Sequence, residues 1–127
     1  MKTLLKTISE NAFFTADSKT LNIIGIFETI NTQNFPAIHP KISCVLSVAG
    51  EPNKIIEYYP ILKGPTGKMI IDGSSKPLSV TIGGNGKFNL IFNLANIKLE
   101  NSGIYSIELH AGDLKEELNF IVQGPNA

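Results

Sequence analysis

Two glycine-rich segments come nearest to a known chemical motif in this chain. Residues 64–69 (GPTGKM) contain the glycines and lysine of a phosphate loop, but the glycines are too closely spaced and Met69 stands where a hydroxyl residue is needed. Residues 83–86 (GGNG) lack the strand-to-helix context of a dinucleotide site. We therefore predict that both segments are turns.

The single cysteine and the two histidines are the other candidates for chemistry. Cys44 falls on the inward register of an alternating strand, which favours a small buried hydrophobe over a nucleophile. His39 lies in a predicted loop and His110 at a strand end, and isolated histidines without paired spacing make a poor metal site. We expect both histidines on the surface, no metal and no cofactor.

Acid–base or triad catalysis is not indicated either. A catalytic carboxylate pair needs two different environments, and no two glutamates can be placed together from the sequence. No nucleophile elbow accompanies any serine. We expect no catalytic residue, and we expect solvated positions for the following glutamates: Glu51, Glu57, Glu108, Glu116 and Glu117.

Tyr58 and Tyr59, beside Pro60, are candidates for an interaction surface. Tyrosine is enriched at interfaces, and we place this pair on an edge strand. Neighbouring side chains on a strand alternate, so one ring is expected to point inward and the other outward.

The elements that must position these residues are strands, because apolar residues alternate with polar ones and helical periodicity is nearly absent. One apolar face on each strand predicts two sheets with their apolar faces together. Residues 21–27 are apolar on both faces, which predicts a central strand, and residues 31–40 are expected to be a crossover loop. The predicted core comprises Leu46, Phe88, Leu90, Phe92, Tyr105, Ile107, Phe120 and Val122.

Turn chemistry fixes two connections. Asn85-Gly86 predicts a hairpin between strands that end at Ile82 and begin at Lys87. A tight turn at residues 112–113 sets the register of the last two strands, which places Glu108 opposite Glu117 and Ser106 opposite Asn119. On the same solvent face Ile104 meets Ile121, and we expect this apolar pair to contribute to self-association or to partner binding.

Residues 99–105 (LENSGIY) are typical of the corner that leads into the sixth strand of immunoglobulin-like sandwiches, with Tyr105 as the corner tyrosine. The tryptophan and the paired cysteine of that fold are missing, and Ile107 stands at the second cysteine position. We predict an all-β, immunoglobulin-like antiparallel β-sandwich of two sheets and about seven to nine strands, without a disulfide, with residues 1–127 forming a single domain.

Composition limits the partners. Of the 127 residues 43% are hydrophobic and 17% are charged, which favours a folded core. Lys plus Arg equals Asp plus Glu at 11 each, so no basic excess indicates nucleic acid or an anionic membrane. No run approaches the roughly 18 apolar residues of a membrane span, and Lys6 interrupts the only signal-like stretch. We expect a cytoplasmic protein.

Residues 21–27 (LNIIGIF) followed by 35–40 (FPAIHP) resemble a family of small uncharacterised bacterial proteins. In that family a first strand leads through a Gly-Lys-Leu-Asn-like turn to a strand ending in Gly-x-Phe and then to a Phe-Pro loop. This chain departs from the pattern at the turn, where residues 17–20 are DSKT. The resemblance implies a small bacterial β domain and carries over no catalytic or binding residue.

From these features we expect a non-catalytic β-sandwich module for protein–protein interaction or assembly, with an unidentified protein partner or a second copy of itself. The alternative is a domain that binds a small ligand, either a carbohydrate or a lipid-like molecule. A hydrolytic enzyme is the third possibility, since spacing alone never excludes a triad assembled in space.

Overall fold

The computed structural model describes residues 1–16 and 20–125, and these form ten β-strands, one short 3-10 turn (η1) and no α-helix. The predicted turn at residues 17–20 lies largely outside the described residues. The elements are β1 (Lys2–Phe14), β2 (Leu21–Ile26), β3 (Thr29–Asn31), β4 (Ala37–Ala49), β5 (Ile55–Lys63), β6 (Met69–Asp72), η1 (Gly73–Ser75), β7 (Leu78–Thr81), β8 (Lys87–Leu99), β9 (Gly103–Ala111) and β10 (Leu114–Gln123).

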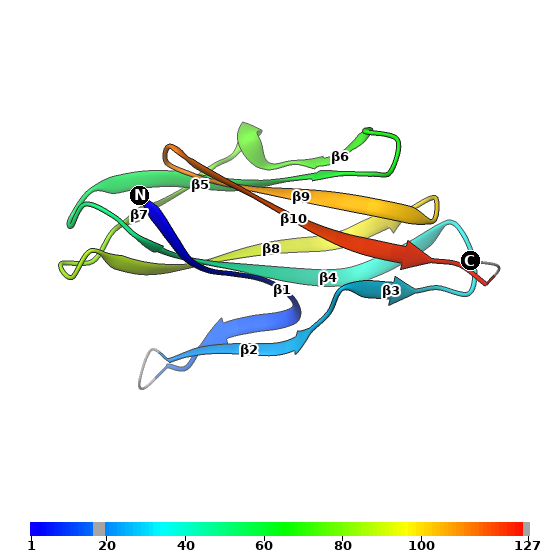
Figure 1. The fold of residues 1–127 in the computed structure, drawn as a ribbon, viewed down its shortest axis with the longest axis horizontal. Helices are drawn as coiled ribbons and strands as arrows, with labels where there is room; N and C mark the ends of the chain where they lie inside the picture. The colour runs from blue at the N-terminus through cyan, green and yellow to red at the C-terminus, as the bar shows by residue number, and fades with distance from the viewer. Residues whose placement is uncertain (17–19, 126–127) are drawn as a thin grey trace.

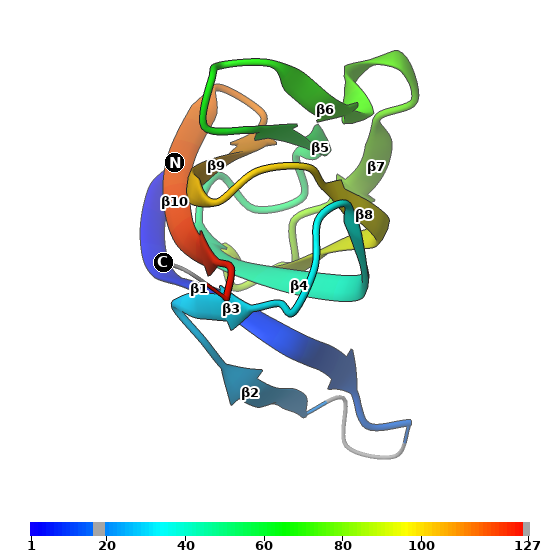
Figure 2. The same cartoon turned by 90° about the vertical axis from the view of Figure 1, so that its right-hand side faces the viewer.

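Two sheets pack face to face, as the alternating pattern predicts (Figures 1 and 2). The four-stranded sheet has the order β2-β1-β4-β8, and the six-stranded sheet has the order β3-β10-β9-β5-β6, with β7 also paired to β5. All pairs are antiparallel except β3 with β10. The strand count exceeds the predicted seven to nine because η1 divides one edge into β6 and β7, and because the short β3 adds a further strand beside β10.

The space between the sheets is filled by aliphatic and aromatic side chains. Seven of the eight predicted core residues are buried: Leu46, Leu90, Phe92, Tyr105, Ile107, Phe120 and Val122. Phe88 is only half-buried, so its predicted burial is wrong in degree. It lies near the start of β8, the edge strand of its sheet, whereas its partner Val48, on the interior strand β4, is fully buried.

The predicted central position of residues 21–27 is wrong, because β2 is an edge strand paired with β1. The outer ends of β1 and β2 extend away from the packed sheets as a two-stranded arm (Figure 2). Ile24 and Ile26 are therefore 52% and 65% exposed. Gly25 allows the Glu10 side chain of β1 to approach closely, since a Cβ on Gly25 would lie 3.0 Å from a carboxylate oxygen of Glu10.

Two connections between the sheets differ from the predictions. Asn85-Gly86 forms a turn, but no hairpin, because β7 pairs with β5 and β8 pairs with β4. Instead, the Gly50 N–H donates to the Gly86 carbonyl at 2.7 Å, which ties the turn to the end of β4. The crossover at 31–40 is confirmed but shorter than predicted, because β4 already begins at Ala37.

The tyrosine corner is confirmed. The Tyr105 hydroxyl donates to the Asn101 carbonyl at 2.7 Å and accepts from the Asn101 N–H at 3.4 Å. The ring is 1% exposed and stacks on Phe120 with a centroid separation of 5.3 Å. The corner thereby anchors the start of β9 and, through it, the outer face of β9 and β10.

Candidate functional site

The outer face of β9 and β10 carries the predicted isoleucine pair. The register of these strands is confirmed throughout, from Ala111 opposite Leu114 to Ile104 opposite Ile121. Ile104 is 61% exposed and Ile121 is 41% exposed. We call these two residues the isoleucine patch. It continues toward β3, where Thr29 pairs with Ile121.

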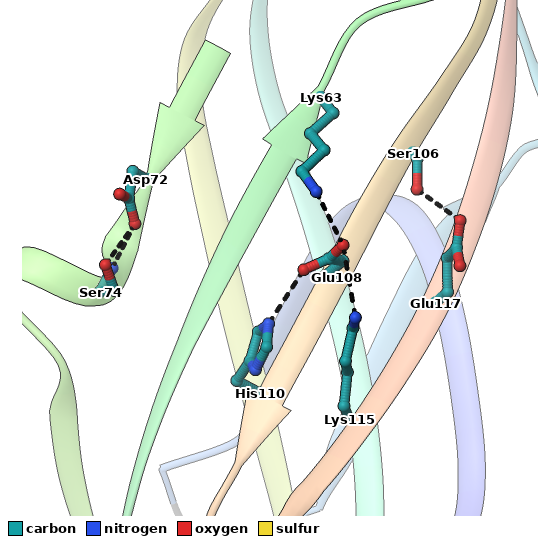
Figure 3. A network of polar contacts seen from close by, with 8 residues as sticks. All are labelled: Lys63, Asp72, Ser74, Ser106, Glu108, His110, Lys115 and Glu117. Atoms are coloured by element: carbon teal, nitrogen blue, oxygen red, sulfur yellow. Dashed lines mark hydrogen bonds and ion pairs between the residues drawn. The ribbon is translucent and has the colours of Figure 1, made fainter. Parts of the chain in front are cut away.

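Further along the same face, charged side chains gather around Glu108 (Figure 3). Its carboxylate lies 3.1 Å from His110 Nε2, 3.3 Å from Lys63 Nζ and 3.7 Å from Lys115 Nζ. The side chain is only 13% exposed, so the predicted solvated position is wrong. The hydrogen bond with His110 is the largest cause that holds the Glu108 pKa below its ordinary value, and Lys63 and Lys115 add to it.

Glu108 and Glu117 face each other across the ladder, as predicted. Their carboxylates take different partners, since Glu117 accepts a hydrogen bond from Ser106 Oγ at 2.7 Å (Figure 3). The like-charge pair is thus relieved by neighbouring donors as well as by solvent.

Tyr58 and Tyr59 are not on an edge strand, so that prediction is wrong. β5 lies between β9 on one side and β6 with β7 on the other. The alternation of the two rings is confirmed: Tyr58 packs edge-on against Phe92 at 5.3 Å, and Tyr59 stacks on His110 at 4.7 Å. His110 is at the opposite end of β9 from Ile104, so the tyrosines and the isoleucine patch do not form one site.

The cysteine and the two histidines lie in strands. Cys44 is buried, and burial raises its thiol pKa to about 12. His39 lies in β4 rather than in a loop, with its ring 6.2 Å from that of Phe27, and burial lowers its pKa. His110 lies near the end of β9, as predicted, and its side chain is half-buried. In the described parts of the chain, no three His, Cys, Asp or Glu side chains gather closely enough to hold a metal ion.

The segment at residues 64–69 is confirmed as a turn, which joins β5 to β6. The Gly67 N–H donates to the Gly64 carbonyl at 3.0 Å, and Gly67 has a φ of +85°. Lys68, the residue that a phosphate loop would use, lies 3.8 Å from a Glu100 carboxylate oxygen. A cavity of about 200 Å³ lies between this turn and the tyrosine corner.

A larger groove, of about 410 Å³, was not predicted. It lies between β8 and the edge of the other sheet, and we call it the β8 groove. The residues that line it are Tyr58, Tyr59, Pro60, Ile71, Gly73, Lys76, Leu78, Phe92, Asn93, Leu94 and Ala95.

The β8 groove exists because the neighbouring edge is interrupted. Pro60 has no N–H to donate, and no residue of β6 or β7 is paired with it. The chain instead bends outward through η1, where a Cβ on Gly73 would lie 2.7 Å from the Pro60 ring. In the sequence, the signal for this groove was a proline inside a predicted strand together with a glycine in the turn that faces it.

These features define a two-sheet, all-β sandwich protein with a tyrosine corner and an exposed apolar pair. A model of a family of unknown function (DUF6941) matches residues 5–123, and the chain belongs to this family. No curated protein matches the chain in sequence. In the described residues, no helix is long and apolar enough to cross a membrane.

Proposed function

We propose that this protein is a non-catalytic, immunoglobulin-like module that acts by binding another protein or a second copy of itself. The observation that carries the proposal is the isoleucine patch, in which two large aliphatic side chains lie directly opposite each other and exposed. Adjacent apolar side chains on an outer sheet face are a common feature of contact surfaces.

The immunoglobulin-like assignment is supported by strand order. β10, β9 and β5 lie side by side in the order of strands G, F and C, and β4 lies beside β8 as strand B lies beside E. The corner tyrosine, Tyr105, lies near the start of β9, which is the counterpart of strand F. We further propose a bacterial, cytoplasmic setting. The bacterial origin rests on the sequence resemblance, and a reducing compartment suits a sandwich whose single cysteine, Cys44, is free.

The surroundings of the patch support contact with a protein. The charged groups around Glu108 lie on the same face and already satisfy one another, with three nitrogen atoms within 3.7 Å of one carboxylate. A partner that covers the isoleucine patch therefore gains apolar contact without removing an unpaired charge from water.

The test is the double variant Ile104→Thr/Ile121→Thr, because threonine keeps the branched shape that strands favour while removing apolar surface. Ile24→Thr/Ile26→Thr, on the exposed arm, is the matched control. If the protein self-associates, light scattering should show a lower mass at high concentration for the patch variant alone. A monomeric wild type whose patch variant also retains every partner would contradict the proposal.

A further inference from the structure

The sandwich is closed along one side and open along the other. On the closed side, β1 lies beside β10 (Figure 2), and the Lys6 Nζ of β1 lies 3.1 Å from a carboxylate oxygen of Glu116 of β10, which joins the two sheets. On the open side, β8 is the last strand of its sheet, and no strand among residues 1–16 and 20–125 pairs with its outer edge. Along β8, only alternate residues direct their backbone N–H and C=O groups toward β4, so the residues between them present unpaired backbone donors and acceptors at the outer edge.

The β8 groove lies along this free edge. Phe92 and Leu94 of β8 form one wall, and Tyr58, Pro60 and Leu78 form the other. An extended segment that pairs with β8 would place alternate side chains toward the groove. Backbone pairing and an apolar pocket thus occur together at one edge, which is the combination that strand-addition sites use.

The charges at this edge are positive. Lys76 lines the groove, and β8 has Lys87 and Lys98 near its two ends and no acidic residue in its sequence. All three lysine residues are exposed. Lys98 has a carboxylate oxygen of Glu100 at 3.9 Å, a long surface contact of small energetic value. An acidic segment therefore complements this edge.

A second copy of β8 fits the edge less well. Antiparallel pairing of two whole β8 strands would place Lys87 of one copy near Lys98 of the other, at both ends of the joint sheet. Such like-charge contacts are destabilising.

We propose that the β8 edge and groove bind an extended, acidic segment of another protein. The segment pairs with β8 as an added strand, inserts a large apolar side chain between Phe92 and Leu78, and places a carboxylate near Lys76. This site is separate from the isoleucine patch, so the inference does not depend on the proposed function of that patch.

The experiment selects a random-peptide display library on the wild-type protein and synthesises the enriched peptides. We expect enriched peptides to contain Asp or Glu together with a large apolar residue. Lys76→Glu and Leu78→Glu should each weaken their binding by about tenfold or more, the equivalent of one lost close contact. Lys54→Glu and Ile55→Glu, also at exposed positions, are the matched controls and should bind as the wild type does.

Two further measurements make the result decisive. Backbone amide signals of residues 87–95 should shift when an enriched peptide is added, and Ile104→Thr/Ile121→Thr should keep full peptide affinity. The inference is overturned if no peptide is enriched, if enriched peptides are basic, or if the two groove variants bind normally. It is also overturned if a fatty acid or an oligosaccharide, but no peptide, occupies the groove.

Discussion

At the scale of single residues, the Tyr105 hydroxyl is the polar group on which the corner depends. Both of its hydrogen bonds go to the Asn101 backbone. Tyr105→Phe removes them and leaves the ring in place, so we expect a loss of about 1 kcal/mol in the free energy of unfolding with the fold unchanged. Urea denaturation measures it. An unchanged midpoint would show that the hydroxyl does not anchor the corner.

The environment of Glu108 predicts that the stability of the protein depends on pH. Its pKa in the folded protein is lowered, first by the hydrogen bond with His110 and then by the lysines. A carboxylate with a lowered folded pKa stabilises the protein above its ordinary pKa, and this contribution is lost as the pH falls through the lowered value. The stability difference between the wild type and Glu108→Gln should therefore be largest near neutral pH and shrink in acid.

Denaturation at a series of pH values measures this difference. His110→Leu removes the nearest hydrogen-bond partner, so it should weaken the same pH dependence. A difference between the wild type and Glu108→Gln that is constant from neutral to acid pH would contradict the role of the network.

The positions of single residues were predicted correctly where they follow from the alternation along a strand. They were predicted incorrectly where they depend on contacts with residues that are distant in sequence. The burial of Cys44 and the opposite directions of Tyr58 and Tyr59 follow from the period of a strand. The shielding of Glu108 does not, because Lys63 comes from β5 and is distant in sequence.

At the scale of elements, the turn at residues 83–86 carries the clearest prediction. Gly86 has a φ of +75°, and a Cβ there would lie 2.8 Å from the Gly50 carbonyl oxygen. We expect Gly86→Ala to reduce the free energy of unfolding by at least about 1 kcal/mol, because alanine is strained at this positive φ and its Cβ would clash with the backbone. Gly84→Ala is the control, since nothing lies within 4 Å of its Cβ position. Equal melting temperatures for the two variants would refute this account of the turn.

The same turn shows why the pairing of strands is harder to predict than the strands themselves. Asn85-Gly86 is typical of a hairpin turn, but the same turn can also carry the chain from one sheet to the other. The outcome is decided by β5, which pairs with β7 and thereby keeps it in the other sheet. The turn at residues 112–113 does join two paired strands, and the predicted register from Ala111 to Ile104 is confirmed.

At the scale of the whole molecule, the core between the sheets holds the fold together without a disulfide. Phe92 is 2% exposed and packs edge-on against Tyr58. We expect Phe92→Ala to reduce the free energy of unfolding by about 3–5 kcal/mol. Phe88→Ala, in the same strand but half-buried, should cost clearly less. A loss below about 1 kcal/mol for Phe92→Ala would contradict its place in the core.

The arrangement of the whole molecule also explains what alternation did not predict. Residues 21–27 are apolar on both faces, yet β2 lies at an edge, because the arm it forms with β1 leaves the sandwich. The β8 groove depends on η1 facing Pro60, a contact between elements that no local pattern specifies.

The central claim, that the isoleucine patch binds a protein, is tested most directly by quantitative capture from the native host. Tagged wild type, Ile104→Thr/Ile121→Thr and the control Ile24→Thr/Ile26→Thr are compared, and captured proteins, including untagged copies of the chain, are quantified by mass spectrometry. We predict that at least one protein is lost from the patch variant and kept by the control. Identical sets of captured proteins for all three would contradict the claim.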